Sequence, residues 1–256
     1  MSDSEHSSAP SGAGKPRVLG RPEKQPLMKR FYKDVTVAAA GNAFRVLLDG
    51  RPLKTPGKLV LAVPNEPLAE AIAAEWRAQG AEINPMTMPL IRLINTALDA
   101  VSGREAEVAV DIVKYAGSDL ICYRAESPAG LVAKQSAAWD PLIAWAASEL
   151  GASFTLAKGI LHVTQPAAAL EAIRRVVTPC DALHLSALHV LTTLMGSCIL
   201  ALAVAKRHLD ADAAWSAAHV DEDWQLSQWG EDTEAAQRRL QRRAELQAAV
   251  VLLELA

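Results

Sequence analysis

The run from Leu185 to Val204 contains no formally charged residue. A run of that length forms either a membrane-spanning helix or a helix that protein covers on every side. His189, Thr192 and Gly196 interrupt it, and it lacks interfacial aromatic residues and a strongly basic flank. The pattern therefore predicts a central buried helix within Asp181 to Lys206, in a helical bundle, with no membrane insertion.

The composition is that of a globular protein with room for a substantial core. The 256 residues are 50% hydrophobic and 21% charged, which suits one large domain or two small ones. A net charge of -3 is too small to favour nucleic acid or a membrane surface as a partner. The three cysteines are far apart and predict neither a metal site nor a disulfide framework, so we expect a reducing compartment.

The first residues differ in composition from the rest of the chain. Residues 1–27 are rich in Ser, Pro, Gly and charge, and they carry no apolar run of signal-peptide length. Their acidic residues are also unlike an amphipathic transit peptide. We predict a disordered tail over residues 1–27, in a protein of the bacterial cytoplasm, with a processed mitochondrial matrix protein as the alternative.

Residues 28–94 are predicted to form a small antiparallel β-rich domain. Strand-like patterns cover Tyr32 to Val37, Phe44 to Leu48 and Leu59 to Val63. Gly41-Asn42 and Asp49-Gly50 separate the first runs and supply the positive φ of tight hairpin turns. A helix follows, with Asn65 as its N-cap, and ends near Gly80.

Residues 95–256 are predicted to form a larger, mainly α-helical domain, because the period changes from that of strands to that of helices near Pro89. The fold class is therefore α+β with two domains. Asp140-Pro141 is expected to break or restart one helix, and short strands are expected at Leu120 to Tyr123 and near Lys158-Gly159. The helices expected after Leu90 to Val101 span Arg104 to Lys114, Leu131 to Leu150, Ala167 to Val177, Asp181 to Lys206, Asp210 to Gln228 and Glu231 to Leu255.

No catalytic, cofactor-binding or metal-binding motif is complete. Gly12 to Lys15 resembles a phosphate-binding loop, but it lacks the earlier glycine, and Pro16 replaces the magnesium-binding hydroxyl. The six histidines form no ligand pair at helical spacing. Cys198 lies in a helical pattern without a nucleophile elbow, so its simplest role is that of a small buried side chain. We expect no enzymatic activity.

A short segment near the C-terminus combines carboxylates with indoles. Carboxylates prefer water and indoles prefer burial, so such a mixture is typical of a recognition surface. A solvated helix face explains the same acidic residues equally well. The candidate partner-binding residues are Asp221, Glu222, Trp224, Gln225, Trp229, Glu231 and Asp232.

Several motifs occur in a fixed order from Lys29 nearly to the C-terminus. They are Lys29 to Lys33, Leu48 to Pro56, Ala73 to Gln79, Met88 to Leu90, Asp119 to Ala125, Gln135 with Trp139 to Pro141, and Trp224 to Asp232. With these motifs the chain resembles the Atp-twelve family of assembly chaperones, which serve the soluble catalytic sector of F-type ATP synthase.

The resemblance implies a β-rich N-terminal domain, a helical C-terminal domain and an ATP-independent chaperone without a cofactor. Its implied partner is the unassembled α subunit of the synthase, whose assembly with the β subunit it promotes, without nucleic acid. We expect a monomer, and we expect Glu222, with the other residues of the segment, to form the client-binding or release surface. The competing hypothesis is a hydrolase or nucleotide-dependent enzyme that uses a carboxylate–histidine pair.

Overall fold

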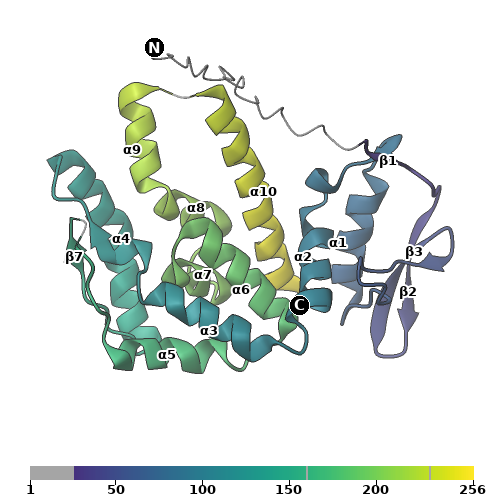
Figure 1. The fold of residues 1–256 in the computed structure, drawn as a ribbon, viewed down its shortest axis with the longest axis horizontal. Coiled ribbons are helices and arrows are strands. Elements are labelled where there is room, and N and C mark those ends of the chain that lie inside the picture. The colour runs from purple at the N-terminus through teal and green to yellow at the C-terminus, as the bar shows by residue number, and fades with distance from the viewer. Residues whose placement is uncertain (1–25, 160, 231) are drawn as a thin grey trace, which may run out of the picture.

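The computed structural model describes residues 26–159, 161–230 and 232–256, so the predicted tail lies almost wholly outside the described residues. The α+β fold is confirmed, with a small β-rich end on the right of Figure 1 and a helical bundle beside it. The strands of the β-rich end are β1 (Met28–Lys29), β2 (Val35–Ala40), β3 (Ala43–Leu48), β4 (Arg51–Pro52) and β5 (Glu82–Ile83). They form two small antiparallel sheets, which pair β1 with β5 and β3 with both β2 and β4.

The predicted hairpin is confirmed. β2 and β3 pair antiparallel from Val35 opposite Leu48 to Ala40 opposite Ala43, and Gly41 adopts a φ of 65° in the turn. The strand expected over Leu59 to Val63 is wrong, because this segment makes only isolated bridges to Phe44 and Lys54. Lys58, in the turn just before this segment, adopts a φ of 69°, and the segment then meets two different partners, the chain after β4 at Val60 and β3 at Val63, in place of one continuous ladder.

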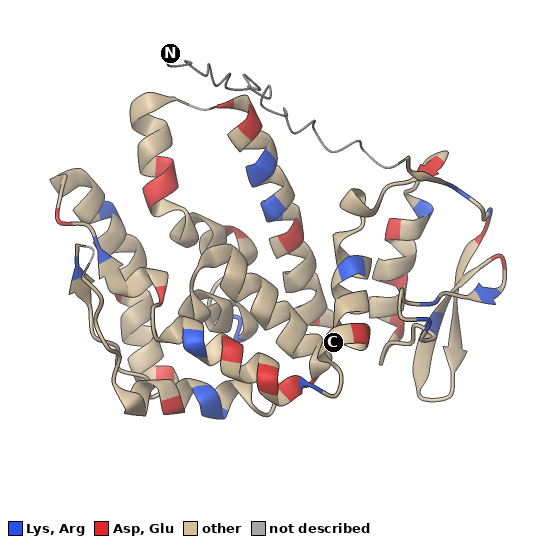
Figure 2. Cartoon of the chain, viewed as in Figure 1, with Lys and Arg blue, Asp and Glu red and all other residues tan. Residues whose placement is uncertain are grey.

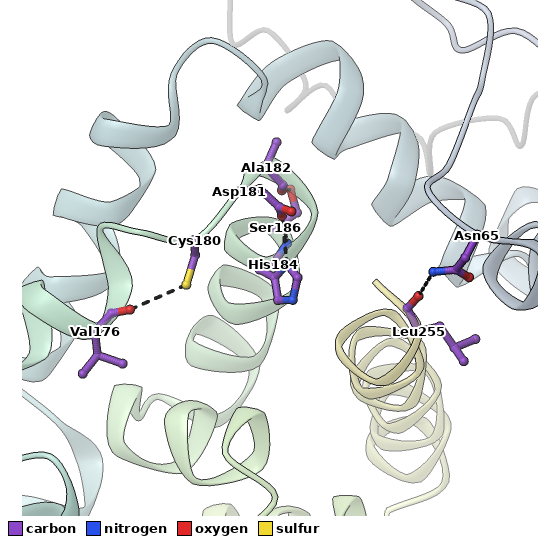
Figure 3. Close-up of polar contacts among 8 residues, drawn as sticks. All are labelled: Asn65, Val176, Cys180, Asp181, Ala182, His184, Ser186 and Leu255. Carbon is purple, nitrogen blue, oxygen red and sulfur yellow. Dashed lines mark hydrogen bonds and ion pairs between the residues drawn. The ribbon is translucent and has the colours of Figure 1, made fainter. Parts of the chain in front are cut away.

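Helix α1 (Glu66–Arg77) covers β2 and β3. The predicted cap is confirmed, since the Asn65 side chain accepts a hydrogen bond of 3.0 Å from the Leu68 N–H. The helix ends at Arg77, three residues before Gly80. The Asn65 amide also donates to the Leu255 carbonyl, which fixes the start of this helix to the end of the chain (Figure 3).

Helix α2 (Pro89–Thr96) links the β-rich end to the bundle. Its N-cap Met88 makes no side-chain cap, and the Glu75 carboxylate of α1 instead accepts from the Leu90 and Ile91 N–H groups, each at 2.8 Å. α2 continues as a π-helical turn, η2 (Ala97–Val101), and packs against α1, α6 and α10. The division between residues 94 and 95 stays a prediction.

The bundle surrounds helices α6 and α7. The remaining elements in this part are η1 (Pro85–Thr87), α3 (Glu105–Ala116), η3 (Leu120–Cys122), β6 (Tyr123–Arg124), α4 (Ala129–Glu149), β7 (Ala157–Lys158), α5 (Ala167–Val177), α6 (Ala182–Met195), α7 (Cys198–Ala205), α8 (Ala211–Ala218), α9 (Val220–Trp229) and α10 (Thr233–Leu255). The strand expected over Leu120 to Tyr123 is mostly wrong, because η3 occupies Leu120–Cys122, where Asp119 caps it, and β6 begins only at Tyr123. The strand expected near Lys158 is present as β7, and it pairs in parallel with β6. α10 packs along α6 and also contacts α2, α7 and α8.

The uncharged run is buried as predicted, but it forms two helices. Asp181 caps α6 by accepting hydrogen bonds of 2.9 Å from the His184 N–H and from His184 Nδ1 (Figure 3). Gly196, at a φ of 65°, ends α6, and the Ser197 hydroxyl caps α7. Within the residues described, no helix is both long enough and apolar enough to cross a membrane.

A buried carboxylate holds this break in place. Asp119 is fully buried, and its two oxygens accept from the Ile121 N–H at 3.3 Å and the Ile199 N–H at 3.0 Å. It therefore caps both η3 and α7. Burial raises the pKa of Asp119 to about 6 in spite of these donors. The single helix predicted over Asp181 to Lys206 is wrong because Gly196 and this capping carboxylate favour a turn.

Two other helix predictions are wrong in opposite ways. The helix expected over Asp210 to Gln228 is divided at His219 into α8 and α9, so Trp215 and Trp224 lie on different helices. Asp140-Pro141 does not break α4, which runs through Pro141. Trp139 and Trp145 anchor α4 on both sides of the proline: both are buried, and Trp139 Nε1 donates to the Ala217 carbonyl at 2.7 Å.

Candidate recognition surface on helix α9

Helix α9 lies at the end of the bundle far from the β-rich end, between α4 and α10 (Figure 1). It is ten residues long, and none of them is buried. Asp221, Glu222 and Asp223 occupy its first turn, visible as the red patch low on this helix in Figure 2. Three carboxylates repel one another, but at a helix N-terminus the macrodipole and the unpaired N–H groups offset that repulsion.

Two of the candidate residues face α4 and anchor α9 to it. Asp221 accepts a hydrogen bond of 2.6 Å from Gln135 Nε2, and the buried Gln135 in turn accepts from the Ala125 N–H at 2.8 Å. The Trp224 ring lies against Gly130, where a Cβ would come within 2.7 Å of its Cη2 atom. Lys134 Nζ lies 5.4 Å from the centroid of that ring. Asp221 and Trp224 therefore hold the helix in place.

Glu222 contacts the C-cap of α8, and Asp223 contacts the N-terminal half of α10. Glu222 Oε2 lies 3.7 Å from His219 Nε2, and the Glu222 side chain keeps 39% of its surface exposed. Asp223 forms an ion pair with Arg239 of α10, whose guanidinium lies 5.7 Å from the Trp215 ring centroid. Asp223 thus joins α9 to α10 although 46% of its side chain is exposed, and Glu222 makes the longer contact with His219 while part of its side chain stays exposed.

His219 is the buried residue at the break between α8 and α9. Its Nδ1 donates to the Trp215 carbonyl at 2.7 Å, and its ring stacks on Trp215 with centroids 3.8 Å apart. Burial lowers the pKa of His219, and nearby Arg242 and Arg239 lower it further, although the Trp215 hydrogen bond and Glu222 act in the opposite direction. A neutral imidazole with Nε2 unprotonated follows from this arrangement.

The remaining candidates lie towards the far end of α9. Gln225 is exposed, and Trp229 keeps 79% of its surface exposed. Glu222, Gln225 and Trp229 share one face of the helix because they are three and four residues apart. Asp232 has a structural contact, since it caps α10 by accepting from the Ala235 N–H at 2.9 Å. Glu231 lies outside the described residues.

The supporting residues of this surface gave little signal in the sequence. Gln135 and Gly130 come from a helix 86 or more positions earlier in the chain, so spacing does not reveal their contacts with Asp221 and Trp224. Arg239 belongs to an arginine doublet, and the sequence does not distinguish an arginine that forms an ion pair from one on a solvated helix face. Only three-dimensional packing brings these groups together.

The surface lacks the features of a reactive centre among the residues that the structure describes. No cluster of three His, Cys, Asp or Glu side chains there has the arrangement of a metal site. Cys198 is fully buried, and burial raises the pKa of its thiol well above the usual value, so it is not a nucleophile. The geometry of α9 suits protein recognition.

Solved structures similar to this chain decide its family. A structure of Atp12 from Paracoccus denitrificans matches with a TM-score of 0.83 and 41% identity, and the match covers 89% of this chain and 98% of that one. The family model described as ATP12 chaperone protein matches residues 29–147. This chain belongs to the ATP12 chaperone family.

Other ATP12-like proteins agree with this assignment. An Agrobacterium tumefaciens protein, described as a candidate chaperone, matches with a TM-score of 0.86 and 46% identity over 90% of this chain and 87% of its own. The mitochondrial protein atp12 of Schizosaccharomyces pombe is 24% identical over 221 residues, which are 82% of this chain and 76% of the relative. The relatives of this chain thus identify it as a chaperone and not an enzyme.

Proposed function

We propose that this chaperone binds the unassembled α subunit of the F-type ATP synthase catalytic sector and promotes its assembly with the β subunit. Membership of the ATP12 family carries the proposal, since it supports a role in ATP synthase assembly. By mass action, such a holdase lowers the population of exposed, aggregation-prone client surface without consuming ATP. The β subunit releases the client when it competes for the same surface.

The outer face of α9 is the proposed client-binding or release surface. Covering the exposed part of the Trp229 indole would contribute on the order of 3 kcal/mol. Glu222 provides an accessible carboxylate on the same face, and Gln225 provides an amide between them. Asp221, Trp224 and Asp232 support this face through the contacts with α4 and α10.

Affinity capture tests the proposed client. The full chain is immobilised and exposed to a lysate of its native organism, and we expect the synthase α subunit to be retained. Charge reversal in Glu222→Lys is expected to reduce that capture by about tenfold or more, since it opposes the charge presented to the client. Glu149→Lys, which reverses an exposed carboxylate at the end of α4, serves as the matched control.

Three outcomes contradict the proposal. If Glu222→Lys left capture and synthase assembly unchanged, Glu222 would not belong to the client-binding surface. If the unmodified chain failed to retain the α subunit, the α subunit would not be its client. Turnover of ATP by the purified chain above background would favour the hydrolase or nucleotide-dependent alternative instead.

We also propose that the protein acts as a monomer in the bacterial cytoplasm. Two of the similar solved structures come from bacteria, whereas the fission yeast relative is named as mitochondrial. Cell fractionation and sedimentation of the native protein test these two points. Recovery in a mitochondrial matrix or sedimentation at twice the mass of the chain would contradict them.

A further inference from the structure

A second surface lies at the β-rich end, remote from α9 (Figure 1). Here a groove of about 1040 Å³ runs between β1, the segment after β3 and the ends of α1 and α2. Leu27, Met28 and Phe31 line it although 41%, 66% and 63% of their surfaces are exposed. Large apolar side chains gathered around one concave surface are typical of an interaction site.

The floor of this groove is already rigid. Tyr32 is buried, and its hydroxyl donates to the Trp76 carbonyl at 2.7 Å. The Tyr32 ring meets Phe31 and Trp76 edge-on, with centroids 5.4 Å apart in both pairs. Arg30 lies over the Tyr32 ring at 4.6 Å and donates to the Gln79 carbonyl at 2.6 Å. A partner would therefore meet preformed aromatic surface and lose little free energy in ordering it.

The rim of the groove is positively charged. Arg51 and Lys54 line it, both are exposed, and no described carboxylate forms a salt bridge with either. Asp49 is the one acidic side chain among the described residues of the lining. Its Oδ1 accepts from the Asp34 and Lys33 N–H groups at 2.8 and 2.9 Å, and these donors, with a smaller effect of the nearby Lys33 and Arg51 charges, hold its pKa below the usual value. Asp49 forms no salt bridge with Arg51, so the Arg51 and Lys54 side chains can still meet a ligand.

The charge of this end differs in sign from that of the rest of the chain. Residues 26–63 contain seven Lys or Arg against two Asp or Glu, whereas residues 64–256 contain fifteen against twenty-four. Blue segments accordingly recur along β1 to β4 and their loops in Figure 2. Such a separation attracts an acidic partner to the groove and repels it from the bundle.

We propose that this groove binds an acidic, extended segment of a partner polypeptide. An apolar side chain of the segment lies on the Tyr32–Trp76 floor, and flanking carboxylates meet Arg51 and Lys54. Nucleic acid fits less well, because two cations line a groove that is mostly apolar and the remainder of the chain is strongly acidic. This inference rests on the proposed chaperone function in one respect, which is that the ligand is a polypeptide.

Peptide binding to the full chain tests this inference. The probe is a fluorescein-labelled peptide of glutamates flanking a central Leu-Phe pair, and fluorescence anisotropy reports its binding. We expect Arg51→Glu with Lys54→Glu to weaken binding by about tenfold or more, and Phe31→Ser to weaken it less. All three positions are exposed, so circular dichroism should show an intact fold. Arg175→Glu, at an exposed site on α5, is the matched control.

Competing outcomes are distinguishable in the same assay. Equal affinity for a peptide with lysine in place of glutamate would overturn the charge argument, and equal affinity of the groove variants would overturn the site. Displacement of the probe by a single-stranded oligonucleotide, with steep salt dependence, would assign the groove to nucleic acid. Glu222→Lys should leave probe binding unchanged, so this inference and the proposed α9 surface fail independently.

Discussion

Helices α7 and α9 are both short, but they are held in opposite ways. Of the eight residues of α7, seven are buried, whereas none of the ten residues of α9 is. Burial of apolar surface and capping by Asp119 determine the position of α7. α9 depends instead on a few specific contacts, which are Gln135 with Asp221, Gly130 with Trp224 and Arg239 with Asp223. The first helix contributes stability, and the second presents accessible side chains.

The largest predicted effect removes apolar volume from α7. Leu200 is fully buried, so Leu200→Ala leaves a cavity and should lower the free energy of unfolding by about 3 kcal/mol. Leu226→Ala makes the same change at a partly buried position of α9 and should cost well under half as much. Urea unfolding followed by circular dichroism measures both. Equal losses of unfolding free energy in the two variants would contradict the proposed difference between α7 and α9.

The second prediction concerns the carboxylate that caps α7. Asp119 in the folded chain keeps its proton up to a pKa of about 6, well above the usual value for an aspartate. Folding therefore takes up a proton between about pH 4 and pH 6, and the stability contributed by Asp119 falls as the pH rises through that window. The loss should amount to about 2–3 kcal/mol and then level off.

Asp119→Asn checks this prediction because the amide does not titrate. Unfolding free energies of the unmodified chain and the variant are measured from pH 4 to pH 7. As the pH rises, the unmodified chain should lose stability relative to the variant, and the difference should level off about one pH unit above the folded-state pKa of about 6. A difference that is independent of pH would show that Asp119 has an ordinary pKa in the folded protein.

A smaller effect tests how α9 is attached. A Cβ at Gly130 would lie 2.7 Å from Trp224 Cη2, so Gly130→Ala should displace the indole and cost about 1 kcal/mol. In a Trp224→Ala background the clash is gone, and the same substitution should stabilise α4 by a few tenths of a kcal/mol. Thermal unfolding of the unmodified chain, the two single variants and the double variant gives the coupling free energy between Gly130 and Trp224. Additive effects would mean that Trp224 does not pack on Gly130.

The sequence predicts those parts of the molecule where one local signal dominates. Turn glycines and alternation fix the β2–β3 hairpin, and Asn65 fixes the start of α1. The breaks at Gly196 and His219, and the continuity of α4 through Pro141, accompany contacts between distant parts of the chain, which join Asp119 to Ile199, Arg239 to Trp215 and Trp139 to Ala217. Local propensity is a weak term beside such contacts, so these three predictions failed.

The candidate surface was predictable in residue type but not in role. Composition places carboxylates and indoles together near Glu222, yet it does not separate Trp224, which lies against α4, from Trp229, which is exposed. Their spacing of five residues assigns them to different faces only once a single helix is known to contain both. The helix predicted from the sequence ends at Gln228, whereas α9 runs through Trp229.

The smallest predicted change in stability accompanies a large change in binding. Trp229→Ser alters a side chain that is 79% exposed, so the free energy of unfolding should stay within about 0.5 kcal/mol of that of the unmodified chain. If the outer face of α9 binds the client, the same substitution should weaken capture of the synthase α subunit by about tenfold. Leu200→Ala provides the converse case, with reduced stability and unchanged capture by the fraction that remains folded. Loss of capture in both variants alike would mean that binding follows overall stability, and the separation between α7 and α9 would then have no functional meaning.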